Sequence, residues 1–330
     1  MLFNTLLFAS TASATCLHGL SMFKRAEGES VKINTFGYGP LNGPLNWASL
    51  EAENEACKAG SNQSPINLDN SVTTVTQKPV LNIPEVEEVE FENLGTTIEV
   101  VTNGTTSIGG TDFRLVQFHM HTPSEHHVNG EYHPLEVHMV HEAVADNTKL
   151  AVLALMFQVS AGESSSIIKS LSSSVSAIST PGTKTAIRGG IDFSDVVAKV
   201  ASSDVLQYTG SLTTPPCAEG VTFMIVKDPL DISVADFNSI KGVVKFNARF
   251  IQNSLGSPNM LEVANRAGTT TAFKPAAVEQ PATSNKTANA TVEAEAAPMS
   301  KGHTFTVTEL HGKPTQIAAV VVKKRTPKYS

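Results

Sequence analysis

The chain has 330 residues, of which 41% are hydrophobic and 17% are charged, and its formal net charge is −7. This composition is typical of a soluble globular protein that is long enough to bury its own core, so a disordered or fibrous chain is excluded. An acidic protein lacks the basic surface needed to bind nucleic acid or an anionic membrane, and no apolar run is long enough to span a bilayer.

The first 25 residues are predicted to be a secretory signal peptide and pro-segment. Residues 2–9 form a mostly apolar stretch that is too short to cross a bilayer, and the small-residue cleavage pattern Ala12-Ser13-Ala14 follows it. The dibasic pair Lys24-Arg25 comes next and is typical of a site cut by processing proteases. We therefore expect a secreted, extracellular protein.

The cysteines and the glycosylation motifs are consistent with export. If Cys16 leaves with the leader, Cys57 and Cys217 remain. In an oxidising compartment these two either pair or stay as buried free thiols, and the residues alone leave both interpretations open. The motif Asn-x-Ser/Thr marks candidate sites of N-glycosylation. These sites are Asn62, Asn103, Asn285 and Asn289.

Short β-branched or alternating segments dominate the globular part and predict strands. They are residues 86–91, 97–102, 113–121, 135–141, 150–159 and 221–226. The clearest helical patterns are residues 164–174 and 234–246. The expected fold is mostly β with short helices (α+β), built on one large, mainly antiparallel twisted sheet. Residues 150–157 are apolar at nearly every position, which predicts a central strand covered on both faces.

The composition changes near residue 268. Residues 269–300 are rich in Ala, Thr, Glu, Asn and Pro and have almost no aromatic residues, which is typical of a linker. The last segment regains β-branched residues, so it forms either an additional strand or a tail. The sequence therefore predicts a leader at residues 1–25, one globular domain at residues 26–268 that carries the active site, and a linker with a tail at residues 269–330.

Seven of the ten histidines lie between residues 116 and 143. His119 and His121 alternate along one predicted strand and so project from the same face, and His138 lies on a second strand. If these strands are neighbours, the three imidazoles meet and leave a fourth position open, as in a catalytic zinc site. Gln117 and Glu136 lie on the same faces and can accept the second N–H of His119 and of His138.

Other interpretations of these residues remain open. His127 and His133 flank turn residues and are expected at the surface, whereas His126 and His141 are expected to make structural hydrogen bonds. The spacing His119-x-His121-x-x-x-Glu125 also fits the first motif of the cupins, which often hold iron or manganese. The second cupin motif is not found. Metal analysis would distinguish a three-histidine zinc site from a cupin site, because zinc prefers tetrahedral coordination and iron or manganese prefers octahedral coordination.

Several segments, in the same order, closely resemble the alpha-class carbonic anhydrases, in particular secreted short-loop members of the bacterial and fungal type. They are FGYGPLNGPLNW (36–47), NQSPINL (62–68), FHMHTPSEH (118–126), LEVHMVH (135–141) and GSLTTPPCAEGVTFMIV (210–226). The resemblance covers residues 34–260. It implies that family's fold, a Zn²⁺ cofactor, and a carbonate dehydratase (a lyase) that reversibly converts carbon dioxide to bicarbonate and a proton by attack of zinc-bound hydroxide.

The resemblance also assigns roles to individual residues. Zn²⁺ would be held by His119, His121 and His138, with Gln117 and Glu136 as orienting residues. Thr213 would hydrogen-bond the hydroxide and donate its own proton to Glu125. Cys57 would pair with Cys217, Tyr38 would join the solvent network, and Phe223 stands where many members carry Trp. The pocket for carbon dioxide would be lined by Val140, Val152, Leu212, Thr214 and Val221.

One position departs from the family pattern. Many members carry a histidine there that passes the proton to buffer, whereas this chain has Thr96, in Asn93-Leu94-Gly95-Thr96. Threonine does not titrate near neutral pH, so proton transfer should be slow or buffer-dependent unless His127 or His133 takes the role. A catalytically silent binding protein is the competing interpretation, but silent relatives usually lose a zinc histidine. Oligomeric state is not predicted.

Overall fold

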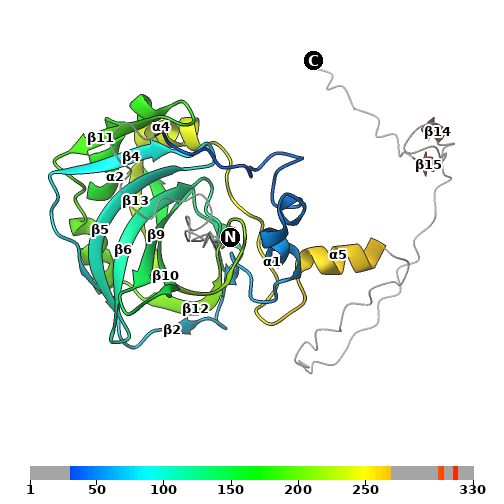
Figure 1. Ribbon diagram of the computed structural model, residues 1–330, viewed down its shortest axis with the longest axis horizontal. Helices are drawn as coiled ribbons and strands as arrows, with labels where there is room; N and C mark the ends of the chain where they lie inside the picture. Colours follow the sequence, from blue (N-terminus) through cyan, green and yellow to red (C-terminus); the bar gives the residue numbers. More distant parts are fainter. Residues whose placement is uncertain (1–29, 269–303, 308–314, 319–330) are drawn as a thin grey trace, which may run out of the picture. The chain divides into compact units, whose positions relative to one another are not determined.

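The computed structural model describes residues 30–268, 304–307 and 315–318 (Figure 1). The chain divides into two units, residues 1–273 and 274–330. The predicted leader, with Cys16, and the sequons at Asn285 and Asn289 lie outside the described residues.

A ten-stranded sheet organises the first unit (Figure 1). Its strand order is β11-β4-β5-β6-β9-β10-β13-β12-β2, and β3 also pairs with β5. All neighbours are antiparallel except β10 and β13, so the large, mainly antiparallel sheet is confirmed. The strands are β2 (Thr73–Thr74), β3 (Val80–Asn82), β4 (Glu88–Asn93), β5 (Ile98–Ile108), β6 (Thr111–His121), β9 (Leu135–Ala143), β10 (Asp146–Ser160), β11 (Lys184–Arg188), β12 (Val205–Ser211) and β13 (Glu219–Ser233).

Strand β10 lies between β9 and β13, and residues 151–157 are all buried, as predicted for a central strand. Its side chains alternate between two apolar clusters: Leu153 and Leu155 pack in one, Val152 and Ala154 in the other. This alternation is the consequence of the two-residue repeat of a strand that is covered on both faces.

Strand β13 is longer than its apolar pattern predicted. It continues through Lys227-Asp228-Pro229, a sequence that usually ends a strand because proline has no N–H to donate. The pairing with β10 shifts register here, since Leu155 lies opposite Val226 and Phe157 lies opposite Leu230. Three residues of β13 thus oppose one residue of β10, and this bulge accommodates the proline.

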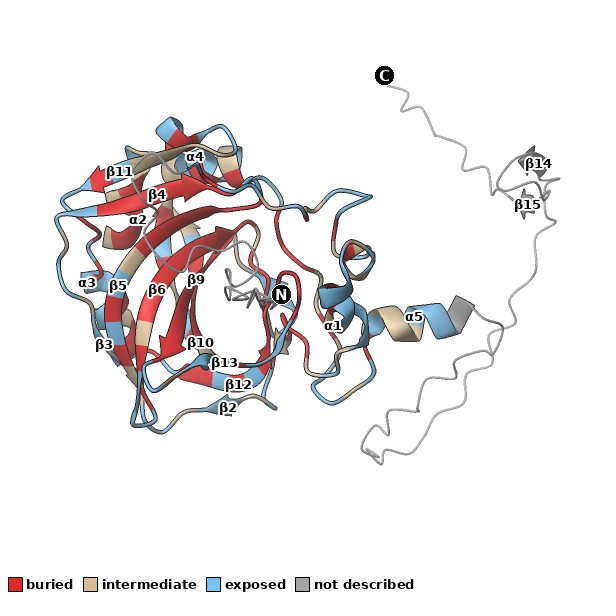
Figure 2. Cartoon of the chain, in the orientation of Figure 1, coloured by how far each residue is buried: buried red, intermediate tan, exposed pale blue. Residues whose placement is uncertain are grey.

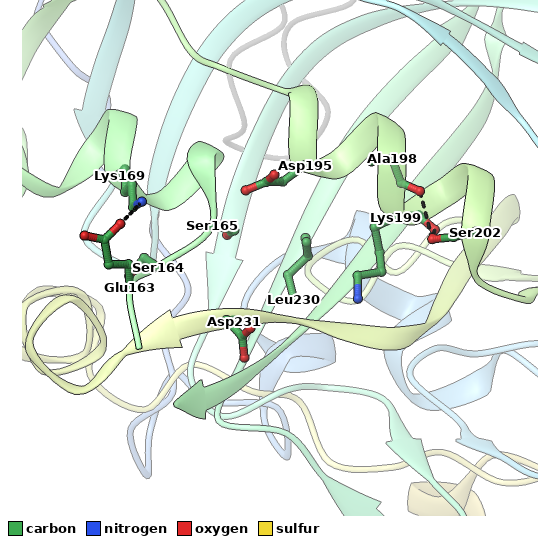
Figure 3. Close-up of a pocket in the computed structure, with 10 residues that line it drawn as sticks. All are labelled: Glu163, Ser164, Ser165, Lys169, Asp195, Ala198, Lys199, Ser202, Leu230 and Asp231. Atoms are coloured by element: carbon green, nitrogen blue, oxygen red, sulfur yellow. Dashed lines mark hydrogen bonds and ion pairs between the residues drawn. The ribbon is translucent and has the colours of Figure 1, made fainter. Parts of the chain in front are cut away.

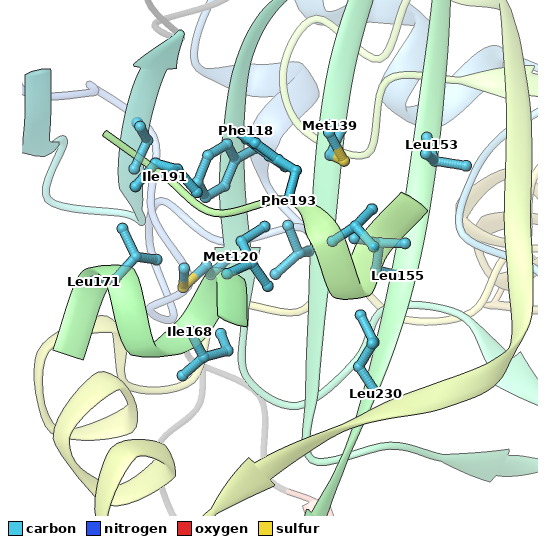
Figure 4. Close-up of a cluster of buried hydrophobic side chains, with 14 of the residues drawn as sticks. Phe118, Met120, Met139, Leu153, Leu155, Ile168, Leu171, Ile191, Phe193 and Leu230 are labelled. Atoms are coloured by element: carbon cyan, nitrogen blue, oxygen red, sulfur yellow. The ribbon is translucent and has the colours of Figure 1, made fainter. Parts of the chain in front are cut away.

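The helices α2, α3 and α4, with the 3₁₀ helix η3, cover one face of the sheet and pack with it in the larger core (Figures 2 and 4). The predicted helices are present as α2 and α4, whereas α3, which buries Val196 and Val200, was missed. Phe118 of β6 packs edge-on against Phe193 with ring centroids 5.8 Å apart. The helices are α1 (Ala56–Ala59), α2 (Ser166–Ser172), α3 (Ser194–Ser202), α4 (Val234–Val244) and α5 (Met260–Gly268), with the 3₁₀ helices η1 (Trp47–Ser49), η2 (Ala52–Glu55) and η3 (Val175–Ile178).

A disulfide joins Cys57 of α1 to Cys217, 160 residues farther along the chain in the loop before β13. Both half-cystines are buried and pack with Phe36 and Trp47. The pairing implied by the family resemblance is therefore confirmed, and the alternative of two free thiols is wrong.

Two small sheets complete the described residues. Strands β1 (Asn67–Leu68), β7 (His127–Val128) and β8 (Glu131–Tyr132) form one of them. In the second unit β14 (Thr304–Val307) pairs antiparallel with β15 (Thr315–Ala318), so this part of the last segment is β structure. Over the ranges that the structure describes, no helix combines the length and the apolarity needed to cross a membrane.

Candidate metal centre

His119, His121 and His138 meet on the face of the sheet opposite the helices. His119 on β6 is the direct cross-strand partner of His138 on β9. The ring centroids lie 5.1 Å apart for His119 and His121, 5.4 Å for His119 and His138, and 4.7 Å for His121 and His138. All three are buried, and one ligand nitrogen from each lies within 4.8 Å of the others. The structure thus brings together the three histidines that the sequence singled out.

A bulge at Val116 places these histidines on the same face. Leu115 lies opposite His141, but Gln117 lies opposite Val140, so β6 gains one residue relative to β9. Leu115 and Phe118 are three positions apart and would point to opposite faces of a regular strand, but both belong to the helix-covered core. The alternation is therefore interrupted between them. Without the extra residue, His119 would lie opposite Val137 and point into that core.

The second nitrogen of each ring has an acceptor. His119 Nδ1 donates to Gln117 Oε1 at 2.9 Å, His121 Nδ1 donates to the Asn247 carbonyl at 2.9 Å, and His138 Nε2 donates to Glu136 Oε1 at 2.6 Å. Because these oxygens can only accept, each ring keeps its other nitrogen unprotonated and available to a metal.

The remaining nitrogens fit a bound cation. Nε2 of His121 is buried and has no hydrogen-bond partner, although buried polar atoms normally have one. Burial lowers the pKa of His121 to about 4, and burial together with the neighbouring imidazoles lowers the pKa of His119 well below its usual value. The rings are therefore neutral near pH 7, which is the state that binds a metal, and a cation would satisfy the unpaired nitrogen.

Glu136 is at the centre of the supporting hydrogen bonds. Its Oε2 accepts from the backbone N–H of Glu125 and of His126, at 2.7 and 2.9 Å, and its Oε1 also accepts from His126 Nδ1 at 2.7 Å. Burial raises the pKa of this carboxyl, but His126 and His138 outweigh burial and hold it well below its usual value. His126, Glu136 and His138 also form a second group of possible ligands. Glu136 Oε1 is already hydrogen-bonded to both imidazoles of this group, so we assign His126 and Glu136 to holding His138 in place and keep His138 Nδ1 as the ligand atom of the trio.

Glu125 lies beside the histidine trio, with Oε1 3.4 Å from His121 Nδ1. The backbone N–H of Arg249 donates to this carboxylate at 2.9 Å. Burial raises its pKa to about 7; His138 and the nearby Thr213 side chain lower it, while Glu136 raises it. Its Oε2 is buried and has no hydrogen-bond partner. Thr213 is buried in the loop after β12. Glu125 and Thr213 therefore lie near each other at the edge of the trio.

Asn247 and Arg249 complete the site and were missed by sequence reasoning. Asn247 binds His121 through its carbonyl, and its side chain donates to the carbonyls of Thr96 and Met120 at 3.0 and 2.8 Å. The Arg249 guanidinium is buried, donates to the carbonyls of Ser64 and Cys57, and lies 5.7 Å above the Trp47 ring. No histidine or cysteine marks this segment, so metal-ligand spacing could not reveal it.

An apolar cluster borders the trio on the same face. Val140 is the cross-strand partner of both Gln117 and Val152, and Val152 lies opposite Phe223 on β13. The Phe223 ring centroid lies 5.8 Å from that of His138. The predicted pocket residues Val140, Val152, Leu212 and Val221 all belong to this cluster, and Thr214 is buried in the adjoining loop.

The other predicted positions lie farther from the trio. The Thr96 hydroxyl accepts from Asn34 at 2.6 Å. His127 is half-buried on β7, and burial lowers its pKa. His141 points to the helix-covered core, where its Nε2 contacts the Thr106 hydroxyl at 2.9 Å and its Nδ1 donates to the Met139 carbonyl at 2.8 Å.

A separate polar pocket of about 430 Å³ lies between α2, α3 and β13, on the helix-covered side (Figure 3). It contains the ion pair of Lys169 with Glu163, together with Lys199 and Asp231. Among the described residues, its side chains form no group of three close metal-ligand atoms. The histidine trio is therefore the stronger candidate for the functional site.

Comparisons with known proteins agree with this geometry. A family model described as eukaryotic-type carbonic anhydrase matches residues 42–260. Alpha carbonic anhydrase 7 of Arabidopsis thaliana is 33% identical over 68% of this chain and 79% of its own length, and a carbonic anhydrase of Neisseria gonorrhoeae is 31% identical over 70% and 85%.

Solved structures give the same result. A fungal alpha carbonic anhydrase from Aspergillus oryzae is 40% identical, with a TM-score of 0.67 over 71% of this chain and 99% of that one. An alpha carbonic anhydrase from Thermovibrio ammonificans, in complex with the inhibitor sulfanilamide, is 33% identical with a TM-score of 0.59, covering 66% and 95%. The cupin interpretation is therefore wrong.

Proposed function

Since the chain belongs to the alpha carbonic anhydrase family and is a carbonate dehydratase that hydrates carbon dioxide, we propose that its cofactor is zinc, held by His119, His121 and His138. The observation that carries this proposal is the convergence of three buried imidazoles, each with its second nitrogen hydrogen-bonded and one nitrogen left unpaired. Three neutral histidines are the ligand set typical of catalytic zinc.

A bound zinc would supply the Lewis acidity that lets a water molecule ionise near neutral pH. Gln117, Glu136 and the Asn247 carbonyl hold the rings in the tautomers that leave His119 Nε2, His121 Nε2 and His138 Nδ1 for the cation. These hydrogen-bond partners therefore select the tautomer of each ring before any reaction takes place.

Thr213 and Glu125 are proposed to orient the attacking oxygen. Glu125 has only acceptor atoms when ionised, so the Thr213 hydroxyl must donate its proton to it. The Thr213 oxygen can then only accept, which fixes the direction in which the attacking species donates its own proton. This arrangement leaves the lone pair of the attacking oxygen free toward the apolar cluster. Replacing Thr213 by Val should therefore lower the rate of hydration while the zinc content stays the same.

The apolar cluster is proposed to hold carbon dioxide. Val140, Val152, Leu212 and Val221 offer no hydrogen bond to water, so an uncharged apolar molecule replaces water there at little cost. Thr214 adds a polar atom at the edge. Bicarbonate is charged and binds such a surface poorly, which favours its release.

Proton release is proposed to depend on buffer. The Thr96 hydroxyl is engaged by Asn34 and does not titrate near neutral pH, so this position cannot pass protons to solvent as a histidine would. Adding imidazole should therefore raise the turnover number of the wild-type enzyme. If imidazole has no effect, His127→Ala and His133→Ala identify whether either of these residues carries the proton.

The disulfide is typical of an oxidising compartment and supports the proposal that the protein is exported, with residues 1–25 as the leader. Residues 26–268 are the proposed catalytic domain and 269–330 the linker and tail.

Stopped-flow hydration of carbon dioxide by the full chain, before and after zinc removal with a chelator, tests the catalytic proposal. Hydration should be lost on removal and restored by zinc, with one equivalent of zinc bound. Equal rates in the loaded and stripped protein would overturn the proposal, and metal analysis that finds iron or manganese instead would overturn the assignment of zinc.

A further inference from the structure

We propose that Asn103 carries an N-linked oligosaccharide and that Asn62, the other sequon among the described residues, does not. Both positions match the motif Asn-x-Ser/Thr, so the sequence treats them alike. The structure separates them. The inference concerns a modification and is independent of the catalytic chemistry.

Asn103 is exposed at an interruption of the sheet. It lies in β5, where the pairing with β6 shifts register between Val101 and Gly104. On the other side of β5, β4 pairs as far as Val101 and β3 pairs only from Thr105. Residues 102–104 therefore have no cross-strand partner on that side, and a sugar at Asn103 displaces no neighbouring strand.

The side chains of this sequon are free to be modified. Asn103 and Thr105 are both exposed, and neither side chain has a hydrogen-bond partner among the described residues. The residue between them is buried: a Cβ on Gly104 would lie 3.0 Å from Ile83 Cγ1 and 3.2 Å from Ile83 Cα. Glycine thus lets the strand pass close to Ile83 while the two residues that define the sequon remain in solvent.

The sequon at Asn62 is held within the fold. Its hydroxyl residue, Ser64, is fully buried, contacts the Tyr208 hydroxyl at 2.7 Å and accepts from the Ser211 N–H at 3.0 Å. Gln63 is buried and donates to the Cys217 carbonyl at 3.0 Å. The backbone N–H of Asn62 itself donates to Glu219 at 2.7 Å. An oligosaccharide attached here would lie against this packed segment and the loop that holds the disulfide.

The modification is a group transfer from a lipid-linked oligosaccharide pyrophosphate. A bond forms between Asn103 Nδ2 and the anomeric carbon of the first sugar, and the bond from that carbon to the pyrophosphate oxygen breaks. The lipid pyrophosphate leaves with the bonding electron pair, and one amide proton passes to a base.

The test is expression of the full chain in a eukaryotic secretory host, followed by mass spectrometry of the intact glycopeptide that contains Asn103. Conversion of Asn103 to Asp is not a sufficient readout, because an Asn-Gly pair deamidates without a glycan. Gel mobility is not sufficient either, because Asn285 and Asn289 are also sequons.

The wild type, Thr105→Ser and Asn62→Gln should carry the glycan at Asn103, and Asn103→Gln and Thr105→Ala should lack it. All five proteins should hydrate carbon dioxide at the same rate, so the outcome is separate from that of the catalytic proposal. An unmodified Asn103 in recovered protein, whether secreted or retained in the cell, would overturn the inference, as would a glycan at Asn62.

Discussion

The two faces of β6 and β9 differ in what their side chains do, although the same two strands supply both. On one face Phe118, Met120 and Met139 pack beneath the helices (Figure 4). On the other, His119 and His138 stand among hydrogen-bonded polar groups that are equally buried. Adjacent residues thus serve stability and chemistry separately, because a strand directs them to opposite sides.

The comparison shows how a buried polar site is maintained. The apolar face gains free energy from burial itself, by about 25 cal/mol for each Å² removed from water. The polar face must satisfy each donor and acceptor, and His121 Nε2 is an acceptor that the protein leaves unpaired. We infer that the rigid apolar face holds in place a site that would not be stable alone.

The largest expected effect comes from His119→Ala. The variant should lose bound zinc, and hydration of carbon dioxide should fall to the uncatalysed rate, because two imidazoles do not retain the cation. Stopped-flow kinetics and elemental analysis check this. Full zinc binding by the variant would mean that the trio is not the metal site.

Substitution of Phe118, the residue before His119, should lower stability and leave zinc binding unchanged. Phe118→Ala removes a fully buried ring and should reduce the free energy of unfolding by about 3–5 kcal/mol. In the protein that remains folded, zinc content should be unchanged. Urea denaturation and elemental analysis measure the two effects. Loss of zinc from folded protein would contradict the separation of the two faces.

His141 tests the apolar face through pH. Burial lowers its pKa from 6.5 to about 4, so between these values the unfolded chain binds a proton that the native protein does not. The contribution of the buried, neutral His141 to the free energy of unfolding is present above pH 6.5. It is lost as the pH falls toward 4, by up to about 3 kcal/mol. In chelator-stripped protein, His141→Gln should flatten the pH dependence of stability by one proton. Identical profiles for variant and wild type would contradict this.

The smallest expected effect is that of Gln117→Ala. Loss of the acceptor for His119 Nδ1 should weaken zinc binding by about 10–100-fold, because the ring is no longer fixed in one tautomer. Competition with a chromophoric chelator measures the affinity. Asp112→Asn, an exposed position on the same strand, is the matched control and should bind zinc like the wild type.

Sequence reasoning was most successful where the pattern is local. The alternation of His119 and His121 and the apolar run of β10 follow from the two-residue period of a strand. The bulge at Val116 could not be predicted, because LVQF is compatible with unbroken alternation and only the pairing with β9 shows the extra residue. Strand β12 and helix α3 were missed because their apolar positions are few and depend on tertiary burial.

Asn247 and Arg249 were beyond prediction for a related reason. Asn247 contacts His121 through its backbone carbonyl, and Arg249 contacts Glu125 through its backbone N–H. Every residue has a backbone carbonyl, and every residue except proline has a backbone N–H. Their contribution depends on where the chain passes, and the identity of the side chain carries no signal for it.

The position of Asn247 has a consequence for biosynthesis. It lies 126 positions after the histidine that it orients, so a nascent chain releases all three imidazoles from the ribosome long before their last partner is made. Until Asn247 is made, the carbonyl that accepts from His121 Nδ1 in the folded domain is missing. The proposed zinc should therefore be loaded correctly only once the domain is complete, so that maturation of this enzyme follows translation.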